Sequence, residues 1–329
     1  MEDYTVFFYY ISAFLASAVI SGWLILISST NAYPNIIRTK KEKYFRNPIT
    51  GENVVFPTLN ENPTLDLSVI VPAYNEEERL CPMLDECIEF LEGRFKSTGF
   101  KYEIIIVNDG SKDKTVQVAE KYCKKLGVDK FRILDLEYNR GKGGAVRLGI
   151  QCGRGSLLLF VDADGATKFA DFDKVEKKLF ELISTTNSKD SADKLAMSIG
   201  SRSHLQDEAI AERSLFRTIL MYGFHFLVWL FAVRTIKDTQ CGFKLFTRKT
   251  AKLCFESLHV ERWAFDVELL YIAEKLKIPI AEVAVNWTEI DGSKITPFWS
   301  WVQMGVDLGL IWLRYTTTAW KIKAKEDLK

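Results

Sequence analysis

The chain has 329 residues, of which 47% are hydrophobic and 26% charged, and its formal net charge is +1. This composition is typical of a globular protein and excludes an intrinsically disordered chain. A near-neutral chain has no global basic field, which argues against bulk binding of nucleic acid. Its six cysteines include no C-x-x-C pair, so we expect buried free thiols rather than a zinc site or a disulfide framework.

An uncharged, apolar segment lies close to the N-terminus. Residues 6–28 contain no charged side chain, and a helix of about 20 apolar residues is long enough to span a bilayer. A cleaved signal peptide is the alternative. Such a peptide begins with basic residues and has a shorter apolar region, whereas Glu2 and Asp3 precede this long run. We therefore predict a retained transmembrane anchor over residues 1–33.

Basic residues follow the predicted anchor directly, within a juxtamembrane linker that we place over residues 34–66. They are Arg38, Lys40, Lys41, Lys43 and Arg46. Basic residues beside a membrane span stay on the cytoplasmic side, so the rest of the chain is expected to face the cytosol. The stretch 47–66 is rich in Pro and Asn, which predicts irregular structure there.

In the next part of the chain, short apolar runs alternate with segments whose apolar residues recur at helical spacing. The runs at 67–71, 102–107, 131–136, 157–161 and 195–200 predict strands, and apolar stripes at 80–91 and 115–126 predict helices. Continuous apolar strands are typical of parallel sheets that are covered on both faces. The predicted fold class is therefore α/β, with an open, mostly parallel, Rossmann-like sheet over residues 67–295. Ligands of such sheets bind beyond the carboxyl ends of the strands.

Two later segments differ from this pattern. Residues 219–233 are almost entirely apolar, and residues 296–320 carry four tryptophans with only Asp307 and Arg314 charged. Buried core helices, helices lying at the membrane surface, and a second span are the alternatives, although 219–233 is too short to span comfortably. Because aromatic residues favour the membrane–water boundary, we favour interfacial helices, the last of them over residues 296–329.

The most informative motif is Asp162-Ala163-Asp164-Gly165, which directly follows an apolar strand. On an extended strand the side chains at i and i+2 lie on the same face but about 7 Å apart, so the chain must turn there to bring the two carboxylates together, as Gly165 permits. Such carboxylates repel each other unless a cation lies between them, and Mg²⁺ or Mn²⁺ takes oxygen ligands and bridges diphosphates. A solvated Asp-rich turn is the ordinary alternative. The hypothesis carried forward is a divalent metal held by Asp162 and Asp164.

Three other segments follow predicted strands in the same way. Asp109 could accept a hydrogen bond from a base or a ribose, or simply belong to a turn before a helix. Tyr74 could stack on a base, although the acids after it also suit the first turn of a helix. The run 139–145 places Lys142 among glycines, which would let backbone N–H groups approach phosphate, but it lacks the ending of a P-loop. All four loops are expected to converge on one edge of the sheet.

Together these motifs resemble the inverting GT-A glycosyltransferases and, within them, the polyprenyl-phosphate sugar transferases. The resemblance covers roughly residues 66–296 and rests on the segments 68–76, 108–111, 141–143, 162–165, 200–202, 238–244, 262–268 and 292–294. The single anchor and the segments 165–169 and 293–295 look most like the members that move glucose from UDP-glucose to dolichyl phosphate on the cytosolic face of the endoplasmic reticulum. That reaction is therefore the expected one.

The resemblance also implies roles for matching residues. The uridine of the donor would be held by Pro72, Tyr74, Glu76 and Asp109, near Lys142. The metal and the diphosphate would be held by Asp162 and Asp164. The candidates for the acceptor phosphate are Arg202, Arg213, Arg217 and Lys294. The candidates for catalysis are Asp164, Arg202, Asp266 and Lys294. Ala166 stands where mannosyl relatives often carry a glutamine that binds the metal, which leaves the predicted metal shell incomplete.

A phosphate acceptor simplifies the chemistry. It is largely ionised at neutral pH, with a second pKa of about 6, so it needs no general base. The site must instead neutralise the departing diphosphate and steer two anions together. Asp266 and Glu268 are then predicted to orient sugar hydroxyls or to bind basic residues, unless they only begin a helix. The other functions considered are mannose transfer from GDP-mannose, a processive polysaccharide synthase, which would need several membrane spans, and a catalytically inactive membrane adaptor. The aromatic helices would also offer a surface for a homo-oligomer, although no particular residue supports one.

Overall fold

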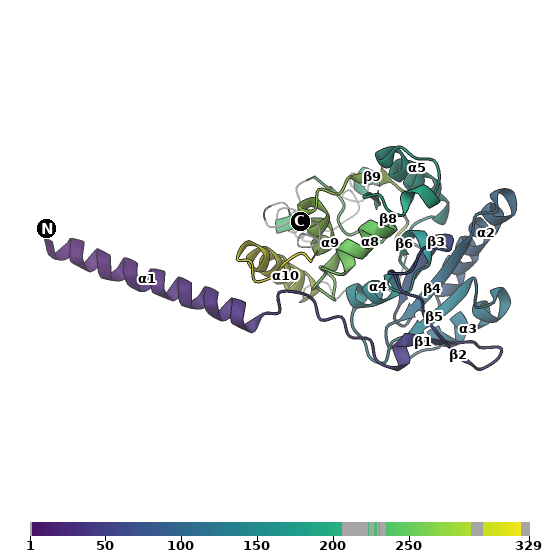
Figure 1. Cartoon of the computed structure of the whole chain (residues 1–329), viewed down its shortest axis with the longest axis horizontal. Coiled ribbons are helices and arrows are strands. Elements are labelled where there is room, and N and C mark those ends of the chain that lie inside the picture. The colour runs from purple at the N-terminus through teal and green to yellow at the C-terminus, as the bar shows by residue number, and fades with distance from the viewer. Residues whose placement is uncertain are drawn as a thin grey trace.

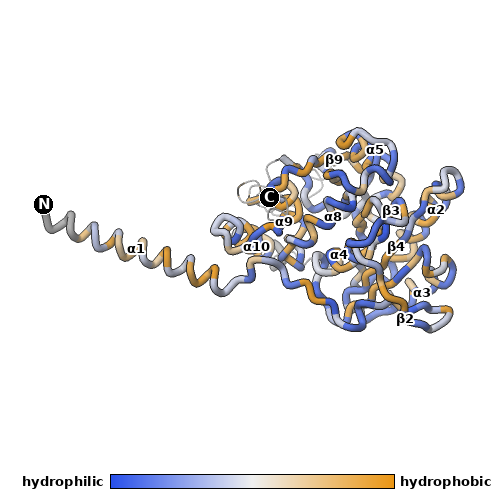
Figure 2. Tube along the Cα trace, viewed as in Figure 1, coloured by the Kyte–Doolittle hydropathy of each residue, from blue (hydrophilic) through white to orange (hydrophobic). Residues whose placement is uncertain are grey.

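The computed structural model describes residues 2–205, 235–290 and 299–323, together with Gly223, Leu227, Val228 and Leu230. A long N-terminal helix, α1 (Glu2–Ser29), extends away from an α/β domain (Figure 1). Residues Tyr9–Ser29 of this helix have a mean hydropathy of 2.1, and none of that stretch is buried. Among the described helices it is the one long and apolar enough to cross a membrane, and Figure 2 shows its most hydrophobic part toward the domain. It is consistent with a membrane anchor.

The central sheet has seven strands in the order β5-β4-β3-β6-β8-β7-β9. Their bounds are β3 (Leu65–Ala73), β4 (Tyr102–Asn108), β5 (Phe131–Asp135), β6 (Gly155–Val161), β7 (Met197–Ser201), β8 (Phe243–Thr247) and β9 (Ile280–Ala284). Neighbouring strands are parallel except at β8, which runs antiparallel to both β6 and β7. This mostly parallel sheet confirms the predicted α/β class.

The strand predictions differ from the structure at β8 and β9. The five predicted apolar runs all coincide with strands, β3 to β7. Strands β8 and β9 have five residues each and contain Lys244 and Glu282, which interrupt an apolar pattern. Lys244 is nevertheless fully buried, because its ammonium group pairs with the Asp266 carboxylate at 2.7 Å. The pairing that makes this strand compatible with the core comes from a distant part of the chain.

Helices cover both faces of the sheet, and alternate residues of each strand face opposite cores. Helices α2 (Leu80–Thr98), α3 (Thr115–Leu126) and α5 (Phe172–Ile183) pack with Val69 and Val71 on one face. Helices α4 (Lys142–Ile150), α8 (Arg248–Phe255) and α9 (Phe265–Lys275) pack with Ile70 on the other. Short 3-10 helices complete the domain: η1 (Lys41–Lys43), η2 (Phe169–Asp171), η3 (Lys189–Ser191) and η4 (Ser203–Leu205).

The last described helix, α10 (Trp299–Thr316), lies on the side of the domain from which α1 departs (Figure 1). Its Met304 and Leu308 are buried in the same core as helices α4, α8 and α9. The indole N–H of Trp23 in α1 donates to the carbonyl of Thr317 at 3.0 Å, just beyond α10. The end of the N-terminal helix and the C-terminal helix therefore meet.

The juxtamembrane stretch contains regular structure that its sequence does not predict. Strand β1 (Tyr44–Arg46) pairs antiparallel with β2 (Asn53–Val55). Phe45 and Phe56, whose ring centroids are 5.0 Å apart, are buried against the domain. Strands of three residues carry too little periodicity to be recognised from sequence. This stretch is part of the folded domain rather than a loose tether.

Candidate active site

The loops after strands β3, β4 and β6 border a cleft of about 430 Å³. Nine of the residues predicted from sequence line it: Pro72, Tyr74, Glu76, Asp109, Lys142, Asp162, Asp164, Arg202 and Asp266. The remaining three candidates, Arg213, Arg217 and Lys294, lie outside the described residues, as does most of the segment 219–233. The expected convergence at the carboxyl edge of the sheet is therefore present for these nine residues, whereas Glu268, which was also considered for the sugar, does not line the cleft.

The acidic tip of strand β6 turns as its sequence requires. Gly165 has a φ of +72°, in the left-handed region, and the Asp164 carboxylate accepts a hydrogen bond from the backbone N–H of Ala166 at 3.0 Å. Burial, and then the neighbouring charge of Asp162, raise the pKa of Asp164. The turn thus holds Asp164 close enough to Asp162 for the charge of Asp162 to oppose the ionisation of Asp164.

Lys142, the first residue of helix α4, carries a positive charge beside this tip. Its ammonium group lies 2.7 Å from the Asp162 carboxylate. Burial by itself would lower the pKa of Lys142, but the charges of Asp162, Asp266 and Asp164 outweigh burial and raise it. Lys142 is therefore firmly cationic, which suits a group that meets phosphate.

The glycines around Lys142 have a packing role. A Cβ atom on Gly143 would lie 2.5 Å from the Cβ of Phe265, and one on Gly141 would lie 2.7 Å from the carbonyl oxygen of Glu261. Gly141 also has a φ of +82°. Helix α4 therefore approaches the start of α9 more closely than any larger residue would allow, which places Lys142 beside Asp266 in the cleft.

Asp109, at the end of β4, holds the loop that leads into helix α4. Its two carboxylate oxygens accept hydrogen bonds from the backbone N–H groups of Arg140, at 2.7 Å, and Gly141, at 3.0 Å. Burial raises the pKa of Asp109 to about 6, although these hydrogen bonds act in the opposite direction. Asp109 thus supports the glycine-rich loop before helix α4 as well as lining the cleft.

Two acid–base pairs form the far side of the cleft. The guanidinium of Arg202 donates from Nε and Nη2 to Asp238 at 2.8 and 2.9 Å, and it lies 5.3 Å from the ring centroid of Trp287. Asp266 accepts from Lys244, and burial is the main reason that its pKa is raised. In each pair one residue, Arg202 or Asp266, lines the cleft, and its partner, Asp238 or Lys244, does not.

Glu268 lies away from the cleft. Its carboxylate accepts hydrogen bonds from the backbone N–H groups of His259 and Val260 and from the hydroxyl of Tyr315 at 2.7 Å. These contacts join helices α9 and α10. Of the two acids at the start of α9, Asp266 lines the cleft and Glu268 binds neighbouring backbone and side-chain groups.

Comparison with known proteins identifies the family. The family model for glycosyl transferase family 2 matches residues 68–185. The dolichyl-phosphate β-glucosyltransferase of Drosophila melanogaster is 60% identical over 315 residues, which are 95% of each chain. The human enzyme of that name is 55% identical over 94% of this chain and 96% of its own, and the Saccharomyces cerevisiae enzyme is 42% identical over 94% and 93%. The chain belongs to the dolichyl-phosphate β-glucosyltransferases.

Solved structures share the GT-A fold with this glucosyltransferase. Mannosyl-3-phosphoglycerate synthase from Rubrobacter xylanophilus aligns with a TM-score of 0.51 and 15% identity over 76% of this chain and 74% of its own. Glucosyl-3-phosphoglycerate synthase from Mycobacterium tuberculosis, solved with UDP, aligns with a TM-score of 0.50 and 16% identity over 79% and 82%. The glucosyltransferase relatives do not favour the mannose-transfer or inactive-adaptor alternatives.

Several residues of the glucosyltransferase cleft received no role from sequence. They are Arg79, Gln240, Arg262, Trp263 and Trp287. Gln240, Arg262 and Trp263 stand in the segments 238–244 and 262–268 that carried the family resemblance, which was the available signal. Trp287 follows Asn286 in a pattern that resembles a glycosylation acceptor, yet the Asn286 amide donates to Asp171 at 3.1 Å. Tertiary contacts bring these residues into the cleft, and no hydrophobic period or turn pattern in the sequence predicts their position there.

The tip of β6 fits a divalent cation that binds together with phosphate. Within the part of the chain that the structure describes, no group of three or more His, Cys, Asp or Glu side chains gathers as a metal site. Mg²⁺ is usually held by one or two carboxylates, with water and substrate phosphates as its other ligands. Asp162 and Asp164 match that donor set, and the mutual opposition of their charges is what a cation would relieve.

Proposed function

We propose that this glycosyltransferase moves glucose from UDP-glucose to dolichyl phosphate with inversion, giving dolichyl β-D-glucosyl phosphate and UDP. The observation that carries the proposal is the cleft at the carboxyl edge of the sheet. It brings two adjacent carboxylates, a cationic lysine and an arginine together at Asp162, Asp164, Lys142 and Arg202. The names of the relatives that match nearly the whole chain support the same reaction.

The donor would lie along the loops after β3, β4 and β6. Pro72, Tyr74, Glu76 and Asp109 would hold its uridine. Asp162 and Asp164 would hold Mg²⁺ or Mn²⁺ with the diphosphate, and the bound metal would supply Lewis-acid stabilisation of the leaving charge. Lys142 adds a fixed positive charge on the same side. The rings of Trp263 and Trp287 would exclude water from the sugar.

The acceptor phosphate would enter from the side of Arg202. One of its oxygens forms a bond to the anomeric carbon of glucose as the bond from that carbon to the diphosphate breaks. The acceptor is already an anion and gives up no proton in this step. Asp238 orients the Arg202 guanidinium for contact with an anion, and Lys244 orients Asp266 toward the sugar hydroxyls. Lys294, Arg213 and Arg217 stay candidates for the same phosphate.

The membrane would deliver the lipid acceptor to this cleft. Helix α1 would span the endoplasmic reticulum membrane once and hold the domain on the cytosolic side. Helix α10 leaves Val302, Val306, Trp312 and Leu313 exposed although its opposite side is buried in the domain. Exposed apolar side chains of this kind suit the membrane–water boundary, so residues 296–329 are proposed to lie against the lipid surface.

A panel of donors tests the proposed function. The full chain in detergent would receive UDP-glucose, GDP-mannose or UDP-N-acetylglucosamine with dolichyl phosphate and Mg²⁺ or Mn²⁺. Appearance of a glucosylated lipid with UDP-glucose alone would support the proposal, since free UDP by itself could come from hydrolysis. Transfer from GDP-mannose instead, or no lipid product with any donor, would refute it.

Removal of helix α1 should separate catalysis from access to the lipid. A chain lacking residues 1–29 should lose more activity on long-chain dolichyl phosphate than on a short, soluble polyprenyl phosphate. The cut removes the contact of Trp23 with Thr317 but leaves Ala32, whose carbonyl accepts from the backbone N–H of Lys321 at 2.8 Å, so one of the two contacts with the C-terminal part persists. Initial rates with both acceptors measure the effect. Equal loss on the two acceptors would show that α1 does more than anchor the domain.

Asp109 should make donor binding depend on pH. Its ordinary pKa is 3.8 and burial raises it to about 6, so the carboxylate is ionised at pH 7 and mostly neutral at pH 5. If the ionised form is required, the Kd for UDP should rise about tenfold between pH 7 and pH 5. Because the terminal phosphate of UDP also titrates near ~6, the comparison is with Asp109→Asn. That variant should bind UDP weakly and show a flatter profile; identical profiles would exclude Asp109 as the titrating group.

A further inference from the structure

Glu42 is a fully buried carboxylate in the juxtamembrane stretch, outside the cleft. Its oxygens accept hydrogen bonds from the backbone N–H groups of Thr39, at 2.8 Å, and Glu137, at 3.2 Å. They also accept from Nη2 of Arg140, at 2.8 and 3.1 Å. Burial by itself would raise the pKa of Glu42, but these hydrogen bonds outweigh burial and lower it. Glu42 is therefore a buried anion with a specific cationic partner.

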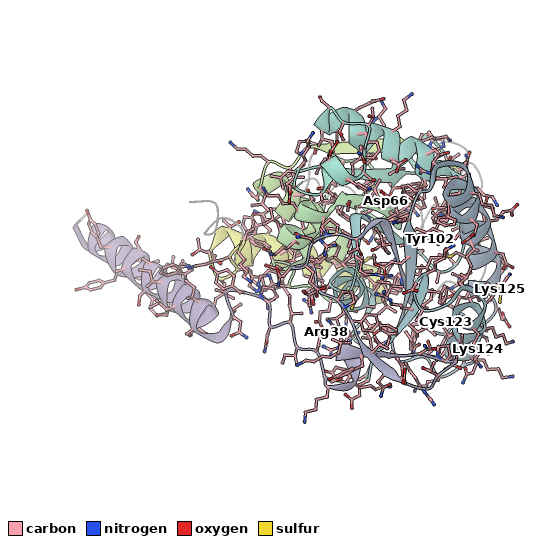
Figure 3. All side chains as sticks on the ribbon, turned by 45° about the vertical axis from the view of Figure 1, so that its right-hand side comes forward. Arg38, Asp66, Tyr102, Cys123, Lys124 and Lys125 are labelled. Atoms are coloured by element: carbon pink, nitrogen blue, oxygen red, sulfur yellow. The ribbon has the colours of Figure 1, made fainter. Side chains whose placement is uncertain are left out.

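The juxtamembrane stretch encloses the guanidinium of Arg140 from more than one direction. Nη1 of Arg140 donates to the carbonyl of Ile37 at 2.8 Å, and the side chain is only 6% exposed. Arg38 donates to the carbonyl of Glu42 at 2.6 Å, and Figure 3 shows Arg38 where this stretch meets the domain. The hydrogen bonds described for the Arg140 guanidinium thus all reach residues 37–42, and the ring centroid of Tyr138 lies 4.5 Å from it.

Arg140 belongs to the loop that bears the glycines and Lys142. While its side chain reaches outward to Glu42, its backbone N–H donates inward to Asp109 at 2.7 Å. The backbone N–H of Gly141 donates to the same carboxylate. Lys142 follows directly and lies 2.7 Å from Asp162. The loop is therefore held on its outer side by Glu42 and on its inner side by Asp109, within two residues of the proposed phosphate contact.

We propose that Glu42 is a positioning residue for the sugar-nucleotide donor, acting through Arg140 on the loop 139–142. The inference rests on the proposed function, because it takes this loop to face the donor diphosphate. Loss of the Glu42 charge leaves the Arg140 guanidinium buried without its counter-ion, which favours movement of Arg140 toward water. The backbone of the loop then moves with it, and Lys142 loses its fixed place beside Asp162. Donor binding weakens, whereas the chemistry of a donor once bound changes little.

The test compares Glu42→Gln with a matched control, Glu103→Gln, in the full chain in detergent. Glu103 is equally buried and pairs with Arg154 at 2.9 Å, but it lies near the start of β4, at the end of the sheet opposite to the cleft. Both variants remove a buried negative charge and should lower the thermal midpoint. Only Glu42→Gln should raise the Kd for UDP and the KM for UDP-glucose, by roughly tenfold, a size usual for coupling between separate sites. The kcat should fall less than about twofold.

Arg140→Gln completes the test and replaces Glu42→Gln if that variant does not fold. It should weaken UDP binding to a similar degree, and the double variant should be no weaker than either single one, because the two residues act as one unit. Multiplied losses in the double variant, or an equal shift of KM in Glu103→Gln, would overturn the proposal. An unaltered KM in Glu42→Gln would overturn it as well. Failure of the unaltered chain to bind UDP would instead refute the proposed function, and the inference with it.

Discussion

Replacement of Asp164 by alanine should abolish glucose transfer while the protein stays folded. Asp164 lines the cleft at the tip of β6, and the hydrogen bond described for its carboxylate is to the backbone of its own turn. Loss of a group that stabilises the departing charge typically costs about 100-fold to 1000-fold in rate. Loss of half of a two-carboxylate cation site should cost at least as much. The measurement is the initial rate of lipid glucosylation with UDP-glucose and saturating Mg²⁺ or Mn²⁺.

Stability provides the second readout for this variant. Asp164 sits close to Asp162, and burial disfavours its charge, so its removal takes away an unfavourable interaction in the ligand-free protein. The thermal midpoint should stay the same or rise. Asp173→Ala, on the exposed side of helix α5, is the matched control and should keep full activity. Near-normal turnover of Asp164→Ala with metal present would contradict the proposed mechanism.

Replacement of Gly242 by alanine should be almost as damaging, although glycine has no side chain to act in catalysis. A Cβ atom at this position would lie 1.9 Å from Oδ2 of Asp162, well inside van der Waals contact. The backbone N–H of Asp162 also donates to the carbonyl of Gly242 at 3.0 Å, so the two backbones cannot simply separate. The added methyl group must therefore displace the Asp162 carboxylate. A displacement of about 1 Å near the reacting groups can cost roughly 100-fold in rate.

Gly93→Ala is the control for the effect of an added methyl group. Gly93 lies within helix α2, and a Cβ atom there would meet no atom within 4 Å. That substitution should leave the rate unchanged and stabilise the protein by about 0.5–1 kcal/mol, because alanine is the better helix former. Rates and thermal midpoints of the two variants would be measured together. Full activity of Gly242→Ala would show that the exact place of the Asp162 carboxylate is unimportant for transfer.

Local patterns predicted those parts of the site that follow directly from strands. Five apolar runs coincide with β3 to β7, and the polar residues after them line one cleft. The reason is geometric: the carboxyl ends of parallel strands lie at one edge of a sheet, so residues at separate strand ends must meet. Asp162, Asp109 and Tyr74 could be placed in this way without knowledge of the tertiary structure.

The partners of these residues could not be predicted, because they come from distant parts of the chain. Arg202 was a candidate for phosphate, but its pairing with Asp238 spans 36 residues. A lysine does not suit a buried strand by itself, and Lys244 is accommodated there because the Asp266 carboxylate lies beside it. Glu42 belongs to the stretch predicted as a basic juxtamembrane linker, yet it is buried against Arg140, which is 98 residues away. Such pairs leave no periodic signal in the sequence, because each partner neutralises a buried charge and does not follow from hydrophobic periodicity.

The sequence by itself determined the α/β sheet, the apolar N-terminal helix and the loops that carry the acidic and glycine-rich motifs. These features depend on hydrophobic periodicity and on backbone conformations that a few residue types permit, and both are local. Only the tertiary structure decided which charges are neutralised and what holds the motifs in place. A buried ion is stable only with a partner within a few ångströms. The folded chain supplies that partner: Lys244 pairs with Asp266, which lines the cleft, and Glu42 pairs with Arg140 outside it.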